Sequence, residues 1–235
     1  MTGTLFLIPT PLAADTAQSI LSPQIKDIIL NTNYFFVENL RTSRRFISEL
    51  KLGKKIEELN FYLLDKETPE SEIEIYIRIL ENGNNVGLMS EAGCPGIADP
   101  GSIAIKMAHK KGIKVVPLAG PSSIFMALMA SGFNGQSFTF CGYLPIDKIE
   151  RVKTIKQLEK EASAKNQTQI FMETPFRNNQ IMQDLLLNCQ GETLISISCD
   201  ISSPDEFIKT QSIDKWRKSV PDLHKKPTIF CLYRK

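Results

Sequence analysis

The amino-acid sequence predicts an α/β protein built from two α/β domains, and two observations carry this prediction. Short apolar runs alternate with longer amphipathic runs along the whole chain, which is the pattern of βαβ units around a largely parallel sheet. The series restarts near residue 119, where an Ala-Gly-Pro-Ser-Ser segment opens a helix of small and apolar residues. We therefore expect an N-terminal domain of residues 1–119 and a C-terminal domain of residues 120–235.

The elements of the first domain follow from apolar periodicity and from the residues that interrupt it. Pro9 and Pro11 stop the first strand, Pro69 is placed to open a helix, and Gly112 ends another helix. The predicted strands are 5–8, 34–37, 61–64, 86–89 and 114–118. The predicted helices lie around 25–29, from about 41, at 69–80 and at 102–111.

The second domain begins with a helix that ends near Gly132. Apolar runs after it predict strands at 138–141, 169–172, 194–198, 206–209 and 228–232, with helices at 148–164 and 175–187 between them. The helix from Lys148 interleaves lysine with glutamate, which predicts a solvated helix.

Composition narrows the function classes only slightly. The net charge of +2 neither requires nor excludes a nucleic-acid partner. The five cysteines form no CxxC pair and no cluster with histidine, so we expect free thiols and no metal. The first residues lack a signal-peptide pattern, and no apolar stretch approaches the roughly 20 residues that span a bilayer. We therefore expect a cytoplasmic protein without a membrane partner.

Several enzyme classes lack their signatures here. There is no GxxxxGK[ST] phosphate loop, and no GxGxxG follows the first strand, which argues against a nucleoside triphosphatase and a dinucleotide oxidoreductase. His109 and His224 have no partners near them in sequence and are interpreted as surface residues.

Four loops at predicted strand ends are unusual, since ligands of open α/β sheets bind beyond the carboxyl ends of strands. They are residues 9–11, 90–101, 119–123 and 173–175. The loop at 90–101 is rich in glycine and proline, so a nucleoside ligand could use its backbone groups directly. It is equally well explained as a tight connection in which Asp99 is a turn or cap residue.

Taken together, these loops resemble the tetrapyrrole methylase superfamily, and most closely its branch of 16S rRNA 2′-O-ribose methyltransferases. Six segments are similar in order and spacing: LFLIPTPL, VENLRTSRRF, GLMSEAGCPGIADPG, VVPLAGPSS, FTFCGYLP and IFMETPFR. The resemblance implies two α/β domains of the tetrapyrrole methylase type. It also implies S-adenosylmethionine as the methyl donor in the interdomain cleft, an rRNA or small-ribosomal-subunit partner, and a homodimer.

On this resemblance, the N-terminal domain carries the glycine-rich donor loop and the acceptor side, and the C-terminal domain completes the donor site. The donor contacts implied by matching positions are Pro9, Gly93, Cys94, Pro95, Ile97, Ser122, Ser123, Met172, Pro227 and Thr228.

The chain also departs from the branch in its polar loops. PIGNL is replaced by residues 11–15, EDTR by residues 38–41, HEHN by the segment around 64–67, SPHR by residues 174–177 and ARELTK by residues 198–203. These departures predict a retained donor site and allow a changed acceptor.

Methyl transfer from a sulfonium requires positioning rather than a metal. A ribose hydroxyl would also lose its proton to a base. Glu38 is the candidate catalytic residue, as base or acceptor orienter; the alternative is an ion pair with Arg41 or Arg44. Glu91 and Asp99 are the other acids in these loops.

Arg41, Arg44 and Arg45 on one short helix are the candidate substrate-binding residues, since guanidinium groups suit RNA phosphates. The alternative is a solvated face that pairs with acids, among them Glu49, four residues beyond Arg45.

Three functions therefore stay open. The first is an rRNA ribose methyltransferase. The second is a methyltransferase of the same fold that acts on a tetrapyrrole or corrinoid precursor or another small molecule. The third is an inactive donor-binding RNA or ribosome factor, against which the small net charge argues mildly.

Overall fold

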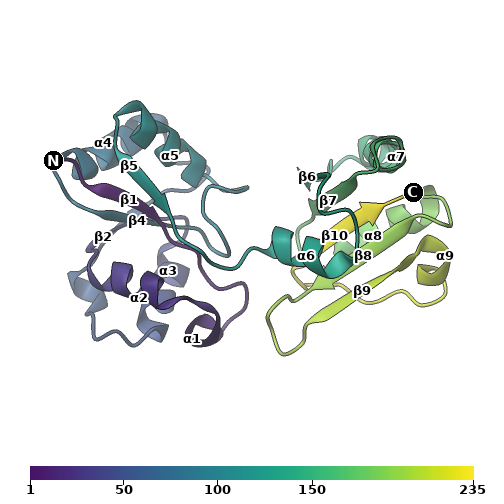
Figure 1. Ribbon diagram of the computed structural model, residues 1–235, viewed down its shortest axis with the longest axis horizontal. Helices are drawn as coiled ribbons and strands as arrows, with labels where there is room; N and C mark the ends of the chain where they lie inside the picture. The colour runs from purple at the N-terminus through teal and green to yellow at the C-terminus, as the bar shows by residue number, and fades with distance from the viewer. The chain divides into compact units, whose positions relative to one another are not determined.

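The computed structural model describes all residues 1–235, and its internal contacts divide the chain into two units, Met1–Ser122 and Ser123–Lys235. Figure 1 shows both units, each with its own sheet and helices. Each unit is described by itself below. No helix combines the length and the apolar character that crossing a membrane requires.

The first unit contains a parallel sheet of five strands in the order β3-β2-β4-β1-β5. The strands are β1 (Thr4–Leu7), β2 (Tyr34–Val37), β3 (Asn60–Leu63), β4 (Val86–Met89) and β5 (Lys114–Pro117). Because every pair is parallel, all five carboxyl ends lie along one edge of this sheet. The loops singled out after β1, β4 and β5 therefore begin at that same edge.

Helices cover both faces of this sheet, as the alternating sequence predicts (Figure 1). Phe35 and Phe36 of β2 are fully buried in two different clusters, one on each face. One face carries α1 (Ala17–Ile20), α2 (Pro23–Leu30), α3 (Leu40–Glu49) and the 3-10 turn η1 (Ile56–Glu58); the other carries α4 (Glu70–Glu81) and α5 (Gly101–Lys110).

The second unit has a mixed sheet in the order β6-β7-β10-β8-β9. Its strands are β6 (Phe138–Tyr143), β7 (Thr168–Met172), β8 (Leu194–Cys199), β9 (Phe207–Ser212) and β10 (Thr228–Tyr233). Only β6 and β7 are parallel, so the expectation of a largely parallel sheet is wrong for this unit. The short link 200–206 joins β8 to β9 as a hairpin, whereas a parallel crossover needs about a dozen residues or more.

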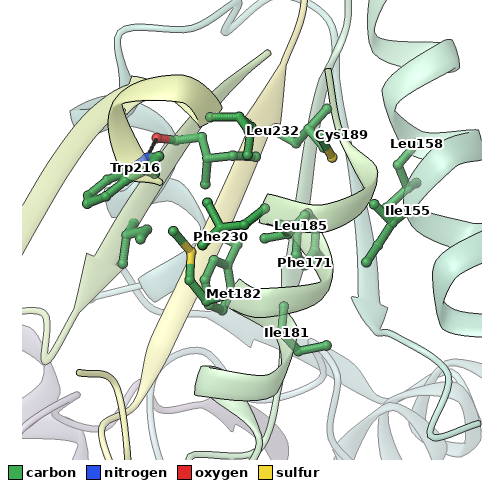
Figure 2. Packing of buried hydrophobic residues seen from close by; sticks show 14 of the residues in the cluster. Ile155, Leu158, Phe171, Ile181, Met182, Leu185, Cys189, Trp216, Phe230 and Leu232 are labelled. Atoms are coloured by element: carbon green, nitrogen blue, oxygen red, sulfur yellow. Dashed lines mark hydrogen bonds between the residues drawn. The ribbon is translucent and has the colours of Figure 1, made fainter. Parts of the chain in front are cut away.

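The helices of the second unit also lie on two faces. Helix α6 (Ser123–Ser131) packs against β8, β9 and β10. Helices α7 (Lys148–Lys165), α8 (Asn178–Asn188) and α9 (Ile213–Trp216) enclose the main core on the other face. Figure 2 shows this core, in which Phe171 and Phe230 stack and the Trp216 indole donates to the carbonyl oxygen of Ile195 at 3.0 Å.

The prediction of a solvated α7 holds only for its outer face. Arg151 is 1% exposed, and its Nε lies 2.7 Å from a carboxylate oxygen of Asp184 on α8. Glu159 is buried as well, and it accepts a hydrogen bond from the Gln190 backbone amide at 2.7 Å. Arg151 is therefore in an ion pair and Glu159 is hydrogen-bonded, which offsets the cost of burying a charge.

Candidate functional site

The loops after β1 and β4 are joined by backbone hydrogen bonds. Thr10 donates its amide to the Gly93 carbonyl at 2.9 Å and accepts the Gly93 amide at 3.1 Å, which makes an isolated antiparallel bridge. The buried Thr10 hydroxyl also donates to the Ser90 carbonyl at 3.3 Å. The first turn and the glycine-rich loop are therefore held as one structure.

Gly93 occupies a position that requires glycine. Its φ is +76°, and an added Cβ would lie 3.3 Å from the Leu12 side chain. Because Thr10 already pairs both backbone groups of Gly93, they are not free for a ligand. Gly93 thus shapes the loop, and ligand contact there would use neighbouring residues.

Two further contacts tie the loop after β5 to the same edge. A Cβ on Gly120 would lie 2.3 Å from the Cβ of Pro9, so the two backbones approach as closely as only glycine allows. The Cys94 thiol donates to the Pro121 carbonyl at 3.3 Å. Burial, assisted by the negative charge of Asp99, raises the pKa of this thiol, which keeps it a protonated donor.

Asp99 organises the second half of the glycine-rich loop. Its carboxylate accepts the Gly96 amide at 2.8 Å and the Gly101 amide at 2.7 Å. Burial raises the pKa of Asp99 even though these amides favour the ionised form. Asp99 therefore has the turn role that the sequence allowed for it, and its oxygens are occupied by the loop itself.

Glu38 lies directly after β2, against the glycine-rich loop. Its amide donates to the Met89 carbonyl at 3.2 Å, and its Oε2 accepts the Glu91 amide at 2.9 Å. Burial raises the pKa of Glu38, the Glu91 amide lowers it, and the charges of Asp99, Glu91 and Asp65 raise it further. No ion pair with Arg41 or Arg44 forms, so that alternative is not realised in the structure.

The three arginines of α3 are all exposed, but they have different surroundings. Arg44 lies over the Phe61 ring at 5.3 Å, and Arg45 pairs with the exposed Asp15 at 3.5 Å rather than with Glu49. Arg41 has no side-chain partner. It is the second residue of α3, and the N-cap Asn39 accepts its backbone amide at 2.9 Å.

A groove of about 210 Å³ lies beside these residues in the first unit; we name it the α3 groove. It is lined by Thr10, Pro11, Leu12, Ala13, Ala14, Thr42, Ser43, Arg45, Phe46, Glu49, Ser90, Glu91 and Ala92. The Ser43 hydroxyl, on a side chain only 2% exposed, has no hydrogen-bond partner. Since buried polar groups are normally paired, this hydroxyl is an exception among the residues that line the groove.

The second unit brings its own predicted donor residues together. Met172 ends β7 and pairs with Ile229 on β10, so Pro227 and Thr228 lie beside it. Next to Met172, the buried Glu173 pairs with Arg177 and accepts the Thr174 amide at 2.7 Å.

The other predicted donor residues fall into two sets. In the first unit, Pro9, Gly93 and Pro95 are buried, Cys94 and Ser122 are half-buried, and Ile97 is exposed. Ser123 belongs to the second unit, where it begins α6.

The structure also shows residues at this edge of the sheet that the sequence did not single out. Thr10 stands between two prolines already noted, and Gly120 lies in the AGPSS segment, so the sequence around both residues pointed to them. Nothing in the sequence pointed to Ser43, because only the packing of α3 reveals its unpaired hydroxyl. All five cysteines are free, and no group of acidic, histidine or cysteine side chains could hold a metal ion.

The comparison with family models decides the family. The model of the tetrapyrrole (corrin/porphyrin) methylases matches residues 23–215. The chain belongs to this family. The predicted fold class and the prediction of an S-adenosylmethionine-dependent methyltransferase are thereby confirmed.

Named relatives of this tetrapyrrole methylase family member are rRNA enzymes. It is 28% identical to the ribosomal RNA small subunit methyltransferase I of Vibrio cholerae over 207 residues, 87% of this chain and 67% of the relative. The protein of the same name from Leptospira borgpetersenii is 30% identical over 202 residues, 84% of this chain and 76% of the relative.

Solved structures share the fold at low sequence identity. The methyltransferase CobJ has a TM-score of 0.66 and 14% identity, covering 100% of this chain and 95% of its own. A Thermus thermophilus uroporphyrin-III C-methyltransferase, solved with S-adenosylhomocysteine, has a TM-score of 0.58 and 14% identity. The match covers 99% of this chain and 98% of that one.

Proposed function

We propose that this protein transfers the methyl group of S-adenosylmethionine to a ribose 2′-hydroxyl of small-subunit rRNA. The observation that carries the proposal is the named function of relatives that are similar over most of the chain. The arginine-bearing α3 beside Glu38 supports it, since arginine suits phosphate and a carboxylate suits a hydroxyl. We further propose that the protein works on the small ribosomal subunit as a homodimer.

For the donor, we propose contacts from both units. Cys94, Pro95 and Ile97 follow the bridged Gly93 in the loop after β4, at the edge where ligands of open α/β sheets bind. Ser122 and Ser123 lie at the start of α6, and Met172, Pro227 and Thr228 lie side by side in the second unit. Pro9 and Gly93 act by fixing the loops, because Pro9 packs on Gly120 and both backbone groups of Gly93 are paired.

For the reaction, S-adenosylmethionine supplies a methyl group on a sulfonium, which is its own leaving group. The acceptor oxygen forms the new C–O bond as the S–C bond breaks, and its proton must leave. We assign that proton to Glu38, whose raised pKa brings its basicity closer to neutral pH. The Glu91 amide holds the carboxylate in place.

A methyltransferase that acts on a tetrapyrrole remains a second candidate because of one observation. The solved structures that share this fold include CobJ and uroporphyrin-III methyltransferase. One of the five segments that depart from the rRNA branch also lines the α3 groove, through residues 11–14. An inactive donor-binding factor would also keep the donor loops.

Two measurements in sequence separate these candidates. Calorimetric titration with S-adenosylmethionine, repeated with S-adenosylhomocysteine, should show micromolar binding at one site per chain. Methyl-labelled donor is then offered with undermethylated 30S subunits and, separately, with uroporphyrin III. Label in rRNA supports the proposal, label in the tetrapyrrole replaces it with the second candidate, and binding without transfer identifies the inactive factor.

Replacing Arg41 with alanine should weaken binding to 30S subunits by several-fold and leave the affinity for S-adenosylmethionine unchanged. Arg41 is exposed and has no partner to lose, so the effect reports a missing phosphate contact. Arg44→Ala is the matched comparison, because it also removes the packing on Phe61. Equal binding by wild type and Arg41→Ala in a filter-binding assay would count against an RNA-facing α3.

A further inference from the structure

A groove of about 570 Å³ lies in the second unit, away from every residue assigned above; we name it the α7 groove. It is lined by Lys156, Glu159, Lys160, Ser163, Ala164, Asn188, Gln190 and Arg234. These residues come from α7, from the end of α8 and just after it, and from the position that follows β10 (Figure 1). The groove is more than twice as large as the α3 groove.

The cations of the α7 groove are unpaired. Lys156 and Lys160 lie four residues apart on α7 and therefore share one helical face, and Arg234 reaches the groove from the strand end. None of the three makes an ion pair or a side-chain hydrogen bond in the structure. Three positive charges thus line one concave surface without neutralisation.

Other lysines on the same helix behave differently. Lys153 pairs with Glu150 at 2.7 Å, and Lys165 pairs with Glu161 at 3.0 Å. Acids of helix α7 therefore pair with these two lysines, while the two lysines that line the groove form no such pair. Lys156 and Lys160 therefore keep their positive charge unpaired, whereas Lys153 and Lys165 are paired with acids of the same helix.

The one acid in the lining does not offset these charges at the surface. Glu159 is 6% exposed, and its Oε1 accepts the Gln190 amide at 2.7 Å and the Thr193 hydroxyl. Its carboxylate is thus turned into the protein and engaged there. The groove presents cationic donors outward, while the Ser163 hydroxyl donates to the Lys235 carbonyl at 3.4 Å and the Asn188 side-chain amide donates to the Asp184 carbonyl at 2.8 Å.

We propose that the α7 groove binds the phosphate backbone of rRNA, as a contact surface separate from the α3 groove. The inference rests on the proposed rRNA substrate. Unpaired lysine and arginine in a concave polar surface are the groups that neutralise phosphates, and such contacts provide affinity without reading sequence. Pockets for small ligands are lined mainly by hydrophobic and aromatic side chains, whereas Ala164 is the one apolar residue in this lining, and the groove is open enough for an extended polyanion.

The test compares two triple variants of the full chain. Lys156→Gln/Lys160→Gln/Arg234→Gln removes the groove cations while keeping polar side chains. Lys106→Gln/Lys215→Gln/Lys218→Gln removes equal charge from exposed positions that have no side-chain partner and line none of these grooves. Binding to undermethylated 30S subunits and to isolated 16S rRNA is measured across salt concentrations, with S-adenosylmethionine titration and thermal unfolding as checks on the fold.

We expect the groove variant to bind roughly tenfold to a hundredfold more weakly than the control variant at 0.1 M salt, with a salt slope smaller by about 2. Its donor affinity should equal that of the wild type. Equal binding and equal slopes for both variants would overturn the inference, provided the wild type methylates rRNA. Weakened binding to 30S subunits with unchanged binding to 16S rRNA would assign the groove to an acidic protein and overturn it too. A wild type that neither binds nor methylates rRNA would refute the proposed function together with the groove.

Discussion

Replacing Gly93 with valine is expected to abolish measurable binding of S-adenosylmethionine and to leave the protein folded. The φ of +76° at this position strains any side chain, and most of all a β-branched one, at a cost of about 1–3 kcal/mol. Relief of that strain would break the two hydrogen bonds with Thr10 that fix the proposed donor loop. The measurement is calorimetric titration with S-adenosylmethionine, with circular dichroism to confirm folding.

The chain provides a matched control for backbone strain. Gly53 has a φ of +75°, and nothing lies within 4 Å of a Cβ added there. Gly53→Val should therefore reduce thermal stability by an amount similar to that of Gly93→Val and still bind the donor with wild-type affinity. Wild-type binding by a folded Gly93→Val protein would refute the placement of the donor at this loop.

Replacing Glu38 with glutamine is expected to lower kcat for methyl transfer by about 10²- to 10⁴-fold, the usual contribution of a general base. Glutamine has the same shape and can still accept the Glu91 amide, so donor affinity should not change. The measurement is the single-turnover rate of label transfer to 30S subunits. Glu91→Gln, at an exposed neighbouring acid, is the control and should retain most activity.

Stability should move in the opposite direction from activity. Burial raises the pKa of Glu38 above its ordinary value of 4.5, so the folded state disfavours the ionised carboxylate. Its favourable contribution is complete below the unfolded pKa and is lost as pH rises through the folded pKa. At neutral pH, Glu38→Gln should unfold at the same or a higher temperature than the wild type. A large loss of stability would mean that Glu38 is structural.

The same carboxylate sets a pH dependence. A base must be ionised, so the wild-type rate should fall as pH is lowered through the pKa of Glu38, with a midpoint above 4.5. In Glu38→Gln this inflection should disappear from the pH profile. An unchanged profile in the variant would assign proton removal to water or to another group.

Much of the fold could be predicted from periodicity. Two strands, 34–37 and 86–89, have the predicted bounds, and the others differ at their ends. The short helices α1 and α9 and the turn η1 were missed, because a single turn has too few residues to show a period. The order of strands in the second sheet also depends on which strands pair across long distances, which a local pattern does not contain.

The site was predictable where glycine and proline mark a backbone constraint, as in the loop at 90–101. It was not predictable where residues far apart in sequence meet. Glu38 and Glu91 are 53 positions apart, and only the parallel pairing of β2 with β4 brings them together. The same holds for Thr10 and Gly93, which meet because β1 also pairs with β4.

These contacts join Glu38 and Thr10 to the two ends of one short segment. Glu38 accepts the amide of Glu91, and Thr10 exchanges two backbone hydrogen bonds with Gly93. A donor that shifts this segment on binding also shifts the amide that Glu38 accepts, and so changes how strongly Glu38 holds a proton. Thermodynamic reciprocity then fixes the converse: protonation of Glu38 must change donor affinity by the same factor by which the donor changes the proton affinity of Glu38. The coupling between the donor and the proton of Glu38 would in that case pass through three residues, 91–93, without any large movement of the chain.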